Sequence, residues 1–159
     1  MSPLNPRRLG ICAVLAICLS PLLFASPPAK APAKTETVDG KVVPLAGVLE
    51  KMGARLDPDA AATALALVTD DGKVYPLVKD DGSRMFYKDK RLLDRRMHLT
   101  GRVLPDVGML QVVQVNSWLN GQLHDVYYWC DVCSIRRSEA GKCDCCGAPL
   151  VLREEPIKK

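Results

Sequence analysis

The sequence has no surplus of positive charge outside its N-terminal segment. Its 159 residues include 22 Lys and Arg against 18 Asp and Glu, a formal net charge of +4 at pH 7. Residues 1–33 hold three basic side chains and no acidic one, so the rest of the chain is nearly neutral. A protein that follows a nucleic-acid backbone needs a basic surface, because its affinity comes from neutralising phosphates and releasing their counterions. The composition therefore argues against nucleic-acid binding.

Catalytic motifs are also missing. The sequence has only two histidines, and it contains no serine nucleophile motif, no His-Glu-x-x-His zinc motif and no glycine-rich phosphate loop. The acidic pairs Asp70-Asp71 and Asp80-Asp81 stand beside glycines, where turn formation and solvation explain them. We therefore expect a non-enzymatic protein.

No apolar run reaches the length of an ordinary membrane span. The longest, residues 9–24, holds about fifteen apolar residues, whereas a span needs roughly 20. Arg7 and Arg8 precede this run, and a short apolar run after a positive flank predicts a signal peptide over residues 1–25. Export to the periplasm or cell envelope follows. An uncleaved signal anchor or a lipoprotein modified at Cys18 is the alternative, and membrane contact would come only through this segment.

The segment that follows is predicted to begin as a linker and continue as β structure. Residues 26–37 are rich in proline and alanine, which is typical of an extended linker. Asp70-Asp71-Gly72 lies between two short apolar runs and predicts a hairpin. Residues 97–104 alternate between apolar and polar side chains, as a half-buried strand does. The predicted strands are residues 63–69, 73–78, 97–104 and 110–115.

The order of these elements indicates a fold. Residues 83–94 are predicted to form one short helix with Ser83 as its N-cap. Residues 42–50 fit either a helix or a strand bent at a glycine, and we interpret them as a strand. Strand, hairpin, short helix and hairpin is the order of a five-stranded OB barrel. Residues 38–117 therefore resemble an OB-fold, in topology only, and a small β-sandwich is the alternative.

A third hairpin leads into the C-terminal part of the chain. Asn120-Gly121 predicts a tight turn, followed by a strand over residues 122–129. Three aromatic residues, Tyr127, Tyr128 and Trp129, come directly before the first cysteine pair. We expect them to pack as a small core rather than to form an exposed stacking platform, because a short tail has little else to bury.

Two Cys-x-x-Cys pairs carry the chemistry. Cys130 with Cys133 and Cys143 with Cys146 are separated by nine residues, and Gly147 follows the second pair. A tetrahedral metal site needs four soft donors, and a Cys-x-x-Cys turn brings two sulfurs close together. Two disulfides are the alternative, since an exported protein enters an oxidising compartment. The exported part has five cysteines, an odd number that disulfides cannot pair completely. We therefore predict metal ligation by the tetrad Cys130, Cys133, Cys143 and Cys146.

The tail also resembles a known family. Tyr128-Trp-Cys-Asp-Val-Cys133 and Gly141-Lys-Cys-Asp-Cys-Cys-Gly-Ala-Pro-Leu150 are similar to the heavy-metal-binding domain of exported metal-efflux components and copper-transporting ATPases. The resemblance covers about residues 128–152 and implies a ribbon-like, metal-binding fold. Cys133 replaces the family's histidine, and Val132 and Ala148 replace its methionines. The fourth thiolate favours a permanently filled site over metal transfer.

The donor set limits the choice of metal. Four thiolates suit Zn(II) in a structural role, and a single iron, as in rubredoxin-like sites, is the alternative. Cys145 is expected to point outward as a free thiol or to make an intermolecular bond. His124 is expected to be an exposed strand residue rather than an outer ligand, and His98 to lie on the outward face of its strand. We predict a zinc-ribbon-like module over residues 118–152 and a charged tail over residues 153–159.

One local excess of charge remains. It is interpreted as a solvated helix face, or alternatively as a contact for an anionic lipid surface, a wall polymer or an acidic partner. Its members are Arg84, Lys88, Lys90, Arg91, Arg95, Arg96 and Arg102. The sequence as a whole predicts an exported, non-enzymatic metal-binding protein with an unknown protein or cell-envelope partner. A redox or electron-transfer protein using the cysteine tetrad, or a protein that handles heavy metals, is the alternative.

Overall fold

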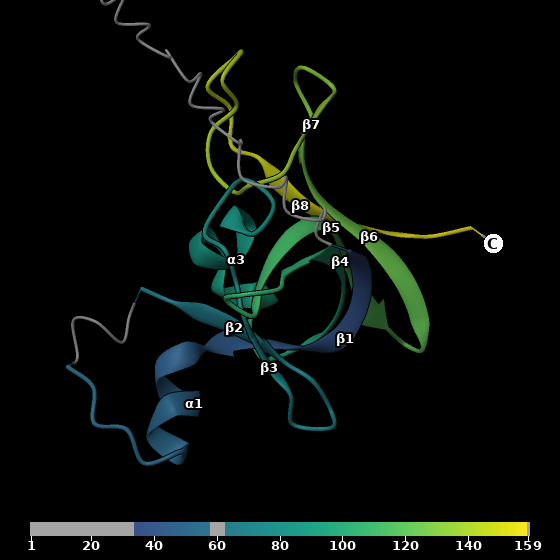
Figure 1. Cartoon of the computed structure of the whole chain (residues 1–159). Helices are drawn as coiled ribbons and strands as arrows, with labels where there is room; N and C mark the ends of the chain where they lie inside the picture. Colours follow the sequence, from purple (N-terminus) through teal and green to yellow (C-terminus); the bar gives the residue numbers. More distant parts are fainter. Residues whose placement is uncertain (1–33, 58–62, 159) are drawn as a thin grey trace, which may run out of the picture. The chain divides into compact units, whose positions relative to one another are not determined.

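The computed structural model describes residues 34–57 and 63–158, and in these ranges the chain is mainly β (Figure 1). The strands number eight and pair antiparallel. The predicted signal peptide and most of the predicted linker lie outside the described residues. Neither α-helix in the described ranges has the length and hydropathy of a membrane span.

The first three strands form a meander, and their boundaries correct two predictions. β1 is Thr35–Pro44, β2 is Leu65–Val68 and β3 is Val74–Pro76. The predicted turn between β2 and β3 is confirmed, and Gly72 supplies its positive φ of 82°. β1 begins inside the range predicted as linker. It ends at Pro44, where the helix α1, Leu45–Lys51, begins, so the strand predicted over residues 42–50 is wrong beyond Pro44.

The single helix predicted over residues 83–94 is two short helices. α3 is Arg84–Lys88, and a 3₁₀ turn, η1, is Lys90–Leu92. Asp89 between them is extended, and its carboxylate accepts a hydrogen bond from the backbone N–H of Arg91. Ser83 stands at the N-cap position of α3 as predicted, but its side chain makes no capping hydrogen bond; its hydroxyl donates to the carbonyl of Val78 and accepts from the N–H of Asp80. Side chain–backbone bonds within the preceding turn have therefore replaced the capping bond.

The central strands form a long antiparallel meander. β4 is Arg96–Leu104, β5 is Met109–Leu119 and β6 is Gln122–Cys130. Asn120 and Gly121 both have positive φ, 51° and 76°, as the tight hairpin between β5 and β6 requires. The strand predicted over residues 97–104 and the hairpin at Asn120-Gly121 are confirmed.

The strands pair as one open sheet. Its order is β3-β2-β1-β4-β5-β6-β7, where β7 is Ile135–Arg137, and β8, Val151–Pro156, pairs with the other edge of β6. The ladder does not close: β3 continues to a single parallel bridge between Leu77 and Leu110 of β5. The mainly β class is thus confirmed, and the sheet of the described residues is open rather than closed into the predicted barrel.

One apolar core lies under both the central strands and the strand that leads to the cysteines. Val126 and Tyr128 of β6 belong to it together with residues from β1, β2, α3, β4 and β5. The Tyr128 hydroxyl, inside this core, donates to a carboxylate oxygen of Asp89 at 2.7 Å. Of the three aromatic residues before the cysteines, Tyr128 packs into the core of the whole sheet. Tyr127 and Trp129 meet edge to face on the other face of β6, and Trp129 is half-buried, so the expected packing into a small core of the tail is confirmed for none of them.

The predicted charged tail is largely a strand. Residues 153–156 belong to β8 and pair with residues 124–127 of β6. Glu154 accepts hydrogen bonds from the Ser117 hydroxyl at 2.6 Å and from the guanidinium of Arg95. The carboxylate of Glu154 thus holds β8 to other parts of the fold. A count of charged residues near the terminus cannot predict such a contact.

Candidate metal centre

The first cysteine pair lies in a tight turn at the end of β6. Cys130 is the last residue of the strand and is fully buried. The backbone N–H of Ser134 donates to the Cys130 carbonyl at 2.8 Å, and the N–H of Cys133 points to the Cys130 sulfur at 3.4 Å. Ser134 completes the turn with a positive φ of 54°. A side chain therefore occupies a backbone position that glycine would adopt with less strain.

The second cysteine pair repeats this geometry. The N–H of Gly147 donates to the Cys143 carbonyl at 2.8 Å, and Gly147 has a φ of 73°. The backbone N–H groups of Cys145 and Cys146 hydrogen-bond to the Cys143 sulfur. The predicted role of Gly147 is therefore confirmed. Ser134 is its counterpart in the first turn, which the sequence did not single out.

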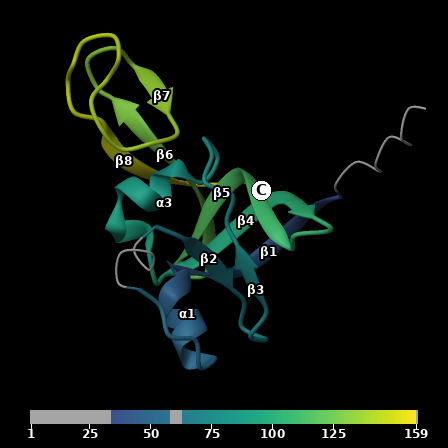
Figure 2. The ribbon, with the colours of Figure 1, turned by 60° about the vertical axis from the view of Figure 1, so that its left-hand side comes forward.

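The second turn is held in a closed loop. Gly141 accepts a backbone hydrogen bond from Leu150 at 2.9 Å, and Cys143 donates one to Ala148 at 2.8 Å. Lys142 and Pro149 form an isolated antiparallel bridge. Because both stems of the loop are paired, the second cysteine pair is presented on a small hairpin that faces the end of β6 (Figure 2).

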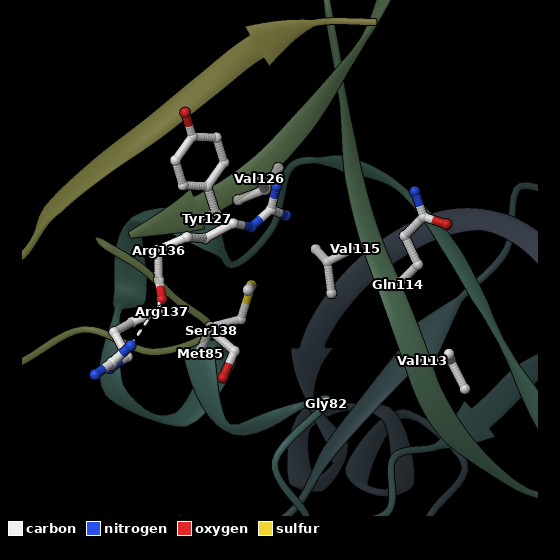
Figure 3. A pocket seen from close by; sticks show the side chains of 10 residues that line it. All are labelled: Gly82, Met85, Val113, Gln114, Val115, Val126, Tyr127, Arg136, Arg137 and Ser138. Atoms are coloured by element: carbon white, nitrogen blue, oxygen red, sulfur yellow. Dashed lines mark hydrogen bonds between the residues drawn. The ribbon is translucent and has the colours of Figure 1, made fainter. Parts of the chain in front are cut away.

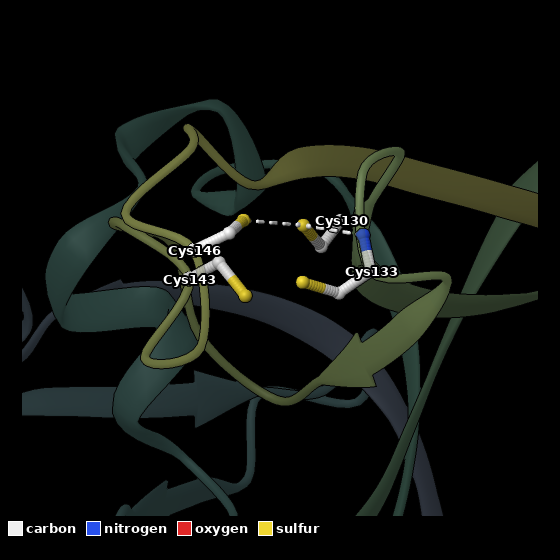
Figure 4. A group of neighbouring side chains, drawn as sticks. All are labelled: Cys130, Cys133, Cys143 and Cys146. Atoms are coloured by element: carbon white, nitrogen blue, oxygen red, sulfur yellow. Dashed lines mark hydrogen bonds between the residues drawn. The ribbon is translucent and has the colours of Figure 1, made fainter.

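The two turns bring four sulfurs together. Figure 4 shows the side chains of Cys130 and Cys133 pointing toward those of Cys143 and Cys146. All four sulfurs lie within 4.8 Å of one another, and the Cys130 and Cys146 sulfurs are 3.5 Å apart. Four thiolates around one tetrahedral ion with metal–sulfur bonds of about 2.3 Å would be roughly 3.7 Å apart. The tetrad could therefore hold a metal ion after a small contraction.

The pKa values of two cysteines in the tetrad are shifted in opposite directions. Backbone N–H groups of Cys146 and Cys145 lower the pKa of the Cys143 thiol to about 7, because they stabilise its thiolate. Contact with the Cys146 thiol, together with that of Cys145, raises the pKa of Cys133. Metal ligands must be deprotonated, and the backbone N–H groups around Cys143 favour its thiolate form.

The remaining sulfur and the histidines lie outside the tetrad. Cys145 is exposed, but its thiol contacts that of Cys133, so it lies beside the tetrad rather than pointing wholly away from it. The five described cysteines are free thiols. His124 has its Nδ1 3.0 Å from the carbonyl of Gln122 and is not part of the cluster.

Most of the basic cluster is paired within the fold. Glu139, in the segment between the two turns, contacts Lys88 at 3.1 Å and Arg84 at 3.5 Å, both on α3. Arg91 is paired with Asp89, and Arg95 with Glu154. These residues therefore tie the cysteine-bearing segment and β8 to the helical connection, and the predicted solvated face is largely neutralised.

The structure also brings together three polar side chains, Asp39, His98 and Trp118, that the sequence did not indicate as neighbours. Asp39 Oδ1 accepts from the indole N–H of Trp118 at 2.6 Å and lies 2.9 Å from His98 Nδ1. Asp39 and His98 are 59 residues apart and meet only because β1 pairs with β4. No local pattern could have indicated this contact. It fixes the orientation of the Trp118 ring on the outer face of the sheet.

Fold and site together define a mainly β protein with a four-cysteine centre that could hold a metal ion. In comparisons with known proteins, no family model matches the chain, and no curated protein or solved structure is significantly similar to it.

Proposed function

We propose that this protein is an exported, non-enzymatic metal-binding protein whose tetrad holds one structural zinc ion. The observation that carries the proposal is the convergence of four cysteine sulfurs within 4.8 Å from two turns of the same geometry. Four thiolates fill a tetrahedral Zn(II) shell and leave no position for a substrate water, which is typical of a structural site.

The surroundings of the sulfurs support a fixed site. Cys130 and Cys143 are buried, and each sulfur accepts backbone N–H hydrogen bonds. Such bonds compensate part of the negative charge that four thiolates place around one ion and orient the ligands. In an oxidising compartment, a bound ion would also keep the cysteines from pairing as disulfides.

We also propose that β1 to β5 act as an OB-like binding or scaffold module. The support is the order of the strands, the position of α3 between β3 and β4, and the parallel bridge between Leu77 and Leu110. An OB-fold is a five-stranded, partly open barrel, and this bridge brings the third strand next to the fifth. Export rests on the predicted signal peptide of residues 1–25, and the proposed partner of the module is another protein or a component of the cell envelope.

Elemental analysis and native mass spectrometry of the purified chain test the metal proposal. The expected result is one zinc per chain, lost in the Cys143→Ser variant and retained in the matched Cys145→Ser variant. A metal-free chain with two disulfides within the tetrad would contradict the proposal. A red protein containing one iron would instead support the electron-transfer alternative, because ferric tetrathiolate sites are coloured and zinc sites are not.

A further inference from the structure

The ladder between β5 and β6 stops abruptly. Their pairing runs from Leu119 with Gln122 to Asn116 with Asp125, and the next pair in register would be Val115 with Val126. The strand pairing of the described residues does not include that pair. β8 follows the opposite edge of β6, so β5 and β7 share one edge, and β7 resumes pairing only at Tyr128. An opening in the sheet is left between β5 and β7.

The free edge of β5 is short and has defined ends. Gly82 closes one end, because a Cβ atom there would lie 1.9 Å from the Val112 carbonyl oxygen. The hairpin with β6 closes the other end at Asn116. Residues 113–115 therefore offer backbone groups on this side that have no strand partner within the described ranges, which is the usual template for adding a chain segment.

A groove lies over this opening, with a volume of about 210 Å³. Its floor is apolar: Figure 3 shows Met85, Val115 and Val126 pointing into the same space from α3, β5 and β6. Its rim is polar and basic, with Gln114 on one side and Arg136 and Arg137 on the other. The volume is below the roughly 300–1,000 Å³ of pockets that enclose a small-molecule ligand. It matches instead one or two side chains of a longer chain that passes across the surface.

The two arginines of the rim differ in how well they are paired. Arg136 is held by both oxygens of Asp125, at 2.5 and 3.0 Å, and its guanidinium stacks on the Tyr127 ring. Arg137 has a single contact of 3.4 Å to the exposed carboxylate of Asp144 and a bond to the carbonyl of Arg136. A guanidinium has five N–H donors, so Arg137 retains donors for a second carboxylate.

From these observations we propose that the groove between β5, β6 and β7 binds an extended peptide segment of a partner protein. The segment pairs its backbone with residues 113–115, places one apolar side chain against Met85, Val115 and Val126, and brings an Asp or Glu carboxylate to Arg137. Main-chain pairing supplies part of the affinity, and the apolar floor and Arg137 supply the sequence preference. The proposal extends the scaffold role to a class of partner and does not depend on which metal the tetrad holds.

Selection from a phage-displayed library of short random peptides, with the metal-loaded full chain as bait, tests the proposal. The expected peptides have an acidic residue next to an apolar one. Binding by a synthetic copy should shift the backbone amide NMR signals of residues 113–115 and 126–127. Arg137→Gln should weaken binding about tenfold or more, because a hydrogen bond to a charged group is lost. Ser138→Trp should weaken it by filling the groove.

The matched control is Arg153→Gln, which removes a similar exposed arginine that is paired with Asp131 and does not line the groove. It should leave the affinity unchanged. Selected peptides without an acidic preference, amide shifts elsewhere on the molecule, or equal losses in Arg137→Gln and Arg153→Gln would each overturn the proposal. So would amide shifts at the groove that follow protein concentration without peptide, because the occupant would then be a second copy of this chain.

Discussion

Two positions near the C-terminal end of β6, Tyr128 and Cys130, differ in what surrounds them. Around Tyr128 the strand is covered by apolar residues from several elements, and the tyrosine hydroxyl bonds to Asp89. Only two residues further on, at Cys130, the neighbours are two loops with short paired stems, and the groups that meet in the middle are four thiols. The first region can fold on apolar burial. The second buries less apolar surface of its own, so we expect its order to depend on a bound ion. One strand thus joins the apolar core to a cysteine-bearing segment that could hold a metal ion.

The largest expected effect separates these two regions. Cys143→Ser removes the sulfur with the lowered pKa and should abolish tight zinc binding, leaving residues 131–150 without fixed order. The signals of β1 to β5 should persist, because their core does not include the tetrad. Backbone amide NMR of the variant measures both. Collapse of dispersion over the whole chain would show that core and centre are a single cooperative unit.

Tyr128→Phe addresses the core side of the comparison. It removes the hydroxyl that donates to Asp89 in a buried site, so it should lower the free energy of unfolding by about 1–3 kcal/mol. Zinc stoichiometry should stay unchanged. Urea denaturation of the metal-loaded chain measures the first quantity and native mass spectrometry the second. Tyr127→Phe, which leaves the Asp89 contact intact, is the control. An equal loss of unfolding free energy in both variants would show that the hydrogen bond to Asp89 is not the cause.

Asp89 should give the core a specific acid sensitivity. The Arg91 guanidinium, together with the Tyr128 hydroxyl, lowers the pKa of Asp89 from 3.8 to about 2. The folded state therefore favours the carboxylate, and the associated stability is present above pH 4 and is lost as the pH falls toward 2. The contribution of ionised Asp89 to the free energy of unfolding is at most about 2 kcal/mol, because solvent around the exposed Arg91 guanidinium screens part of the interaction. Comparing acid unfolding of the chelated wild type and of Asp89→Asn measures it. If the two curves remain equally separated from pH 6 to pH 2, Asp89 is not the titrating group.

The smallest effect concerns the two turns themselves. Ser134 and Gly147 occupy equivalent positions with positive φ, so Ser134→Gly should stabilise the metal-loaded centre and Gly147→Ala should destabilise it, each by about 1 kcal/mol. Competition with a zinc chelator detects both changes as shifts in apparent affinity. Effects of the same sign in the two variants would show that the turns are not equivalent.

The sequence predicts the features that depend on local chemistry. Asn120-Gly121, Asp70-Asp71-Gly72 and the two Cys-x-x-Cys turns lie where expected, because each needs a backbone conformation that its own residues favour. The four metal-ligating candidates were found in the same way.

Features that depend on distant partners could not be predicted. The break at Asp89 follows from its contact with Tyr128, 39 residues away. β8 forms where a charged tail was predicted, because Glu154 finds Ser117 on β5 and Arg95 just before β4. The meeting of Asp39 and His98 likewise exists only in the paired sheet.

The most direct test of the account is X-ray absorption spectroscopy at the metal edge of the purified full-length chain. A zinc edge with a single shell of four sulfur neighbours at about 2.3 Å is the predicted result, and it should be the same in Cys145→Ser. A shell containing nitrogen or oxygen neighbours, or a spectrum that changes when Cys145 is replaced, would contradict the assignment of Cys130, Cys133, Cys143 and Cys146 as the complete ligand set.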